Sequence, residues 1–209
     1  MFSAEIEYRL QNVFQKGFFS KSDSGFQFVE DEDDGQMVLN LVIHNQALCI
    51  MNLDKQNPIP FLNQRKGFYA RRADYALFEF TSDNICRLHI FEMTTTVSQG
   101  KWETKIKQQF KSAYVYCMAV AACLDIEIRD VMFYTIYVND DFTSRLSADD
   151  DHSTALLKAP LGIYRPLPVE EWTGNKVKFD FGHYHEFKHE KINVIWQEAS
   201  YPTGTYEIT

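Results

Sequence analysis

A long helical period followed at once by a strand-like run constrains the fold of this chain more than any other feature. Between Lys101 and Leu124 the apolar residues return every three or four positions, which predicts an amphipathic helix of about six turns. "VMFYTIYV" (131–138) is apolar and rich in β-branched and aromatic residues, as expected of a central strand. Two more strands are predicted before the helix, at 75–80 and 87–93. A helix between two strands requires a crossover, so we expect an α/β protein whose sheet has a parallel component.

The first fifty residues predict a helix and then a hairpin. Ser3 is a suitable N-cap for an amphipathic helix that ends near Gly17. "FVEDEDDGQ" (28–36) is expected to be a solvated acidic turn. "MVLNLVIH" (37–44) and "ALCIMNL" (47–53) predict two strands that pair through a tight turn at "NQ".

The last third of the chain differs in composition from the rest. After Asn139 the sequence is acidic and turn-rich, "PLGIYRPLPVEEW" (160–172) follows with three prolines, and 176–199 predicts additional strands or a hairpin. We therefore expect a core over residues 1–139 and a β-rich C-terminal extension over residues 140–209 that packs on it.

Charge and composition limit the classes of function. The net charge is −8 and the pI is near 5.2, which disfavours a general nucleic-acid coat, although a local basic groove remains compatible. No apolar stretch reaches the roughly 18 residues of a membrane span, and the N-terminus lacks the apolar run of a signal peptide, so we expect a cytoplasmic protein with no membrane contact. The four cysteines form no CxxC pair, which favours reduced buried thiols over a zinc cluster.

Two carboxylates on neighbouring predicted strands are the strongest chemical signal. Asp74 directly precedes the strand at 75–80. Glu92 follows "LHIF" and precedes "MTTTV", so it lies in a stretch of strand that otherwise avoids formal charge. If the two strands pair antiparallel through "TSDN" (81–84), the start of one lies beside the end of the other, and the acids meet there. Carboxylates together with a backbone carbonyl, that of Met93, are the hard oxygen ligands that Mg²⁺ or Mn²⁺ prefers. The pattern therefore predicts a divalent metal site.

These elements and acids resemble the PD-(D/E)XK, or restriction-endonuclease-like, superfamily over about residues 3–138. The resemblance implies an αβββαβ core with a mixed central sheet that cuts DNA or RNA with Mg²⁺. In its pattern Asp74 and Glu92 match the two acids of the motif. The N-terminal helix often supplies a further carboxylate, for which Glu7 or Glu5 is the candidate.

The chain departs from that pattern at the lysine, which normally lies two residues after the second acid. Thr94 occupies the position here, and a neutral hydroxyl does not stabilise developing negative charge as a lysine does. Some members of the superfamily carry the lysine on the following helix, where this chain has Lys101 and Lys105. The alternatives are an active endonuclease with a relocated lysine and a non-catalytic protein on the same fold. The second would act through a protein partner or as a homo-oligomer.

Three histidines near the C-terminus give a third hypothesis. His183, His185 and His189 lie in one polar segment, and the first two would share a face of a strand, as in some zinc sites. A solvated hairpin is the competing and favoured interpretation.

Overall fold

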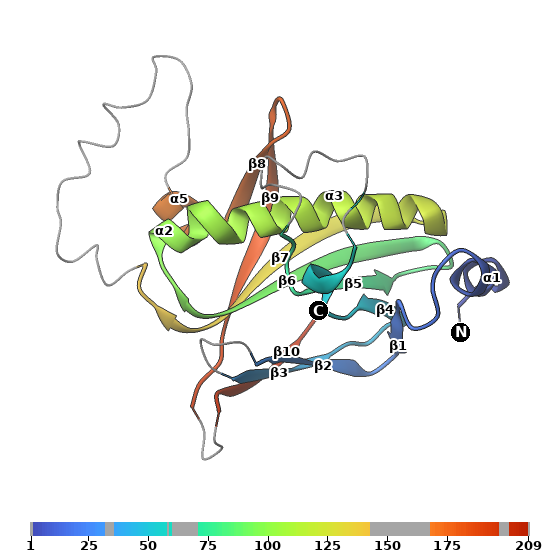
Figure 1. Cartoon of the computed structure of the whole chain (residues 1–209), viewed down its shortest axis with the longest axis horizontal. Helices are drawn as coiled ribbons and strands as arrows, with labels where there is room; N and C mark the ends of the chain where they lie inside the picture. Colours follow the sequence, from blue (N-terminus) through green and yellow to red (C-terminus); the bar gives the residue numbers. More distant parts are fainter. Residues whose placement is uncertain are drawn as a thin grey trace.

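The computed structural model describes residues 2–31, 36–57, 59, 71–142, 168–196 and 201–208, and it is a mixed α/β structure. The stretches predicted at 32–35 and 143–167 lie outside the described residues. Two sheets are present, one of seven strands in the order β1-β4-β5-β6-β7-β9-β8 and one of three strands in the order β10-β3-β2. Figure 1 shows the long helix α3 on one face of the large sheet and the small sheet on the other.

The strands of the large sheet are β1 (Ser20–Ser22), β4 (Ala47–Ile50), β5 (Tyr75–Phe80), β6 (Ile85–Val97), β7 (Glu127–Asp140), β8 (Lys176–Asp180) and β9 (Tyr184–Asn193). Those of the small sheet are β2 (Gly25–Glu30), β3 (Met37–Val42) and β10 (Thr203–Glu207). The helices are α1 (Ala4–Asn12), a 3-10 turn η1 (Leu53–Lys55), α2 (Gln99–Lys101), a π-helical turn η3 (Trp102–Ile106), α3 (Lys107–Leu124) and α5 (Pro168–Thr173).

The predicted crossover is confirmed. Strands β4, β5 and β6 pair antiparallel in turn, α3 then crosses the sheet, and β7 returns parallel to β6. The predicted hairpin in the C-terminal part is formed by β8 and β9, and β9 adds to the sheet parallel to β7. The described strands of the extension therefore complete the two sheets that the earlier strands begin.

The predicted hairpin between "MVLNLVIH" and "ALCIMNL" is wrong. Strand β3 pairs with β2 and β10, whereas β4 pairs with β1 and β5, so consecutive strands belong to different sheets. The physical reason is burial: Leu39 and Leu41 of β3 pack face-to-face against the large sheet, beside Ala47 and Cys49 of β4. The chain between them passes from one layer to the other. Helix α1 is also shorter than predicted. It ends at Asn12, whereas the sequence predicts an end near Gly17.

The apolar core has two parts, one on each face of the large sheet. The first lies between the sheet and α3, where Trp102, Ile106 and Phe110 are fully buried against residues of β5 and β6. The second lies between the two sheets and includes Phe28 and Phe91. In the described part of the chain, no helix is both long and apolar enough to cross a membrane.

Candidate metal centre

Asp74 and Glu92 lie at the same end of the β5–β6 pair. Tyr75 is opposite Phe91 in the antiparallel register, so the residue before β5 and the residue after Phe91 are neighbours. The Asp74 backbone N–H donates to the carbonyl of Phe91 at 3.1 Å. The Asp74 carboxylate accepts a hydrogen bond through Oδ2 from the Met93 N–H at 2.6 Å. The turn after β5 therefore brings the two acids together.

The carboxyl group of Asp74 is strongly perturbed although part of the residue is exposed. Burial of the group among protein atoms raises its pKa to about 8, and the Met93 N–H opposes that shift. The carboxylates of Glu30 and Asp54 raise the pKa further, and the ammonium of Lys105 lowers it. The positive charge near Asp74 is therefore too small to offset the cost of ionising this buried carboxyl group.

Glu92 is more deeply buried, with 1% of its surface exposed. Burial and then the charge of Asp74 raise its pKa well above the usual range, and Lys105 and a hydrogen bond with Gln109 lower it. Its Oε2 atom has no hydrogen-bond partner among the described residues. A buried carboxylate oxygen in this condition requires a proton or a cation.

Lys105 is the lysine that acts on both acids, because its charge lowers the pKa of each. It belongs to η3, whose buried Trp102 and Ile106 fix the turn against the sheet. Single π-helical turns within helices are frequent at functional sites. Lys101 lies one turn earlier, in α2, where its backbone N–H is capped by the Ser98 hydroxyl.

Thr94 lies two residues after Glu92 and on the same side of the strand. It is 4% exposed, and its hydroxyl donates to the Thr96 carbonyl at 3.2 Å, so the group is held within its own strand. Met93 contacts Asp74 through its backbone N–H, whereas its side chain packs in the core between the sheets. These contacts order the strand around Glu92 and supply no positive charge.

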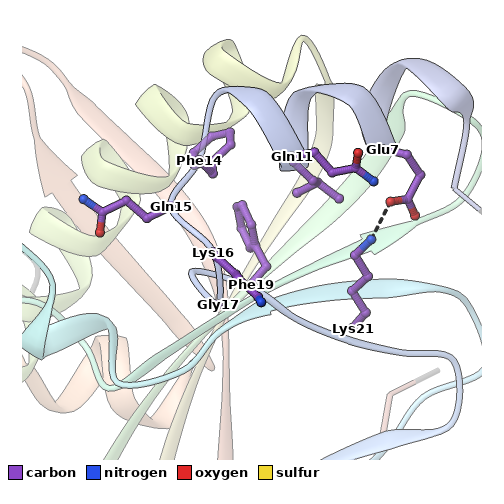
Figure 2. A pocket seen from close by; sticks show the side chains of 9 residues that line it. Glu7, Gln11, Phe14, Gln15, Lys16, Gly17, Phe19 and Lys21 are labelled. Atoms are coloured by element: carbon purple, nitrogen blue, oxygen red, sulfur yellow. Dashed lines mark hydrogen bonds and ion pairs between the residues drawn. The ribbon is translucent and has the colours of Figure 1, made fainter.

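Glu7 is not part of this group. Its carboxylate pairs with Lys21 at 2.6 Å and lines a separate cavity of about 360 Å³, together with Phe14 and Phe19 (Figure 2). Glu5, the alternative candidate, forms an ion pair within α1 at 3.0 Å.

The position of α1 explains why Glu7 is distant. Arg9 in α1 contacts the carbonyl of Cys123 and the carboxylate of Asp125, both at the C-terminal end of α3. Lys105 precedes the N-terminal end of that helix, whose 18 residues span about 27 Å. Figure 1 shows α1 and α2 at opposite ends of α3.

Two residues that sequence reasoning missed contribute to the site. Gln109, 6% exposed, donates through Nε2 to the Arg72 carbonyl at 3.2 Å and hydrogen-bonds with Glu92. Its sequence signal is its position one turn after Lys105, next to the apolar stripe of the helix. Glu30 ends β2 and raises the pKa of both acids, although the sequence placed it in a solvated turn.

The oxygen atoms available at this site are of the kind that binds a hard divalent cation. Carboxylate and amide oxygens are the ligands that Mg²⁺ and Mn²⁺ accept, and the unpartnered Oε2 of Glu92 is an acceptor awaiting a cation or a proton. Among the described residues, however, no three His, Cys, Asp or Glu side chains are close enough to form a metal cluster. A bound ion would therefore need an amide, carbonyl or water oxygen besides Asp74 and Glu92.

The three histidines are not brought to one point. His183 and His185 lie at the exposed β8–β9 turn with ring centroids 4.3 Å apart. His189 is fully buried, its Nε2 lies 2.9 Å from the Thr135 hydroxyl, and its ring packs against Trp102. Burial lowers the pKa of His189 to about 3, so the ring is neutral.

Comparisons of the chain with protein-family models, with curated proteins and with solved structures found no match.

Proposed function

We propose that this protein is a Mg²⁺-dependent nuclease that hydrolyses phosphodiester bonds of nucleic acid at Asp74 and Glu92. The proposal rests on one observation. The buried carboxyl groups of Asp74 and Glu92 lie close together, and the charge of Lys105 lowers the pKa of both. The chain order also supports it. Helix α1, strands β4, β5 and β6, helix α3 and strand β7 follow the αβββαβ order of the PD-(D/E)XK superfamily once β1, β2 and β3, which lie between α1 and β4, are set aside.

The roles of the residues follow from their charges and positions. Asp74 and Glu92 would hold the cation, which when bound activates a water and offsets charge on the leaving oxygen. The Met93 N–H keeps Asp74 in place, and Gln109 does the same for Glu92. The Lys105 ammonium would orient the attacking water and stabilise the negative charge that develops on the phosphate. Lys105 thus takes the role that Thr94 does not fill.

A non-catalytic interaction protein, acting on a protein partner or as a homo-oligomer, is the second candidate. The acidic surroundings favour it, because Glu30 and Asp54 add negative charge close to Asp74, where an active site must admit a phosphate. The 1% exposure of Glu92 favours it too. In this case the carboxyl pair would be a protonated remnant of a metal site.

A combined cleavage and metal-binding experiment separates the two candidates. Supercoiled plasmid, single-stranded DNA and RNA are incubated with the protein in Mg²⁺ or Mn²⁺, beside the near-isosteric variants Asp74→Asn and Glu92→Gln. Glu186→Gln is the matched control, because Glu186 is exposed and pairs with lysines on the β8–β9 hairpin. The nuclease proposal expects cutting by the parent and the control and none by the two variants. A parent that neither cuts nor binds metal overturns it in favour of the interaction protein.

A further inference from the structure

We infer that the cavity between α1 and the segment leading into β1 binds a single nucleotide, either free or as part of a nucleic-acid chain. The cavity has a volume of about 360 Å³, within the range of roughly 300–1,000 Å³ that holds small molecules in proteins. The inference goes beyond the proposed function and does not depend on it, because α1 lies at the opposite end of α3 from α2 and the turn that carries Lys105 (Figure 1).

The cavity forms where the chain turns back after α1. The helix ends at Asn12, and Gly17 has a left-handed backbone with a φ of 81°, which glycine adopts without strain. The chain then runs back past the helix into β1. Side chains of α1 and of the turn after it form one wall of the cavity, and Phe19 and Lys21 form the other (Figure 2).

The apolar side chains of the cavity favour a flat aromatic ring as part of the ligand. Leu10, Phe14 and Phe19 line the cavity, and each is half-buried. The rings of Phe14 and Phe19 are in edge-to-face contact with centroids 5.1 Å apart, and Phe18 stacks on Phe14 at 5.4 Å. Rings held in place by their neighbours offer a surface on which a nucleobase can stack.

The charges at the rim favour an anion. Lys16 and Lys21 supply two positive charges and Glu7 supplies one negative charge, so the lining has a net charge of +1 in a chain whose net charge is −8. Lys21 is held at the rim, because it pairs with Glu7 at 2.6 Å and its ammonium lies 5.4 Å from the centre of the Phe2 ring. Lys16 is exposed at the same rim, so its ammonium is accessible to a phosphate group.

Two glutamines at the rim complete the match to a nucleotide. Gln11 and Gln15 are exposed and line the cavity, and each amide carries both donors and an acceptor. Glutamine amides pair with the edge of adenine through such groups. A purely apolar ligand would leave the lysines and amides without a role, and inorganic phosphate would leave the rings without one. A nucleotide uses all three.

The test measures binding of adenosine monophosphate by isothermal titration calorimetry in the presence of a chelator, beside adenosine and ribose 5-phosphate. Phe14→Leu removes a ring and keeps the site apolar, and Phe18→Leu is its matched control, because Phe18 belongs to the same aromatic cluster and does not line the cavity. Lys16→Met removes a charge at the rim, and Lys188→Met does so at an exposed position of β9. Circular dichroism checks that each variant is folded.

The parent should bind adenosine monophosphate more tightly than either fragment. Phe14→Leu should weaken binding by roughly fivefold or more, because base stacking on an aromatic ring is lost. Lys16→Met should weaken it by about two- to fivefold, and both control variants should bind as the parent does. Glu7→Gln should strengthen binding, because it removes the negative charge that opposes the phosphate and releases Lys21 from its ion pair.

A parent that binds adenosine monophosphate no more tightly than ribose 5-phosphate overturns the inference, as does equal binding by the parent and Phe14→Leu. Displacement of the nucleotide by single-stranded oligodeoxyadenylate would identify the ligand as a nucleotide within a chain, and binding without displacement would identify it as a free nucleotide. Asp74→Asn should bind adenosine monophosphate as the parent does. A parent that binds no nucleotide therefore overturns this inference and leaves the proposed nuclease site standing.

Discussion

The backbone N–H of Met93 donates to Oδ2 of Asp74 at 2.6 Å, which ties the residue after Glu92 to the residue before β5. The bond joins the backbone of one strand to the side chain of the acid on the next. Asp74 is therefore held in position by the sheet itself. If the proposed metal is bound here, its site is organised before the ion arrives, which lowers the cost of ordering its ligands on binding.

The Asp74 carboxyl group should make the metal-free protein less stable as the pH rises from about 4 to about 8. The pKa of Asp74 is near 8 in the folded state, against an ordinary value near 3.8, so in this window the folded chain keeps a proton that the unfolded chain has released. Unfolding then releases a proton, and the free energy of unfolding falls by up to about 1.4 kcal/mol per pH unit for one proton. The raised pKa of Glu92 acts in the same direction.

Urea denaturation of the parent and Asp74→Asn in the presence of a chelator, between pH 5 and pH 8, checks this. The variant should show the weaker pH dependence, because its amide does not titrate. The buried His189 is common to both proteins and cancels in the comparison. The stability that Glu79 gains from its hydrogen bond with His89 is lost only below this window, because the folded pKa of Glu79 is lowered. Parallel curves for the two proteins would contradict the prediction.

If the proposed nuclease function is correct, Lys105→Met should reduce the cleavage rate far more than Lys101→Met. Lys105 acts on both acids, and loss of a charge-stabilising group at the reacting centre costs roughly 10²- to 10³-fold in rate. Lys101→Met should stay within about tenfold of the parent. Single-turnover cleavage of plasmid at saturating Mg²⁺ measures both. A larger loss in Lys101→Met would assign the relocated lysine to the earlier turn.

Glu7→Gln should leave Mn²⁺ affinity unchanged, because Glu7 lies at the far end of α3 and pairs with Lys21 (Figure 2). The expected loss of stability is less than about 1 kcal/mol, as for most ion pairs near the surface. Metal titration and urea denaturation of this variant provide the measurements. Weaker metal binding in Glu7→Gln would restore α1 to the site.

Glu171→Ala should destabilise the protein by about 1–3 kcal/mol, because it leaves the Trp102 indole N–H without its acceptor in the core. The Glu171 carboxylate, 2% exposed, accepts from Trp102 at 3.1 Å and pairs with Lys107 at 2.8 Å, so it attaches α5 to the turn that carries Lys105. Glu103→Ala, at an exposed position of the same turn, should change stability by less than about 0.5 kcal/mol. Chemical denaturation followed by tryptophan fluorescence compares them, and equal stabilities would contradict the assigned role.

The amino-acid sequence by itself was sufficient for elements whose evidence is local. The strand at 75–80 is present with those bounds, the strand at 131–138 lies within β7, and the helical period at 101–124 lies within α2, η3 and α3. The antiparallel pairing of β5 and β6, predicted from the short turn between them, is also present. Because that pairing is local, the neighbourhood of Asp74 and Glu92 followed from the sequence.

Contacts between elements that are distant in the chain depend on tertiary packing. It placed β3 and β4 in different sheets and left Glu7 at the wrong end of α3 for the site. It also brought Glu30 and Gln109 to the two acids. Hydrophobic periodicity reports which side of an element is buried and not what it is buried against. A glutamine beside an apolar stripe therefore has the pattern of a solvated residue until the strand opposite it is known.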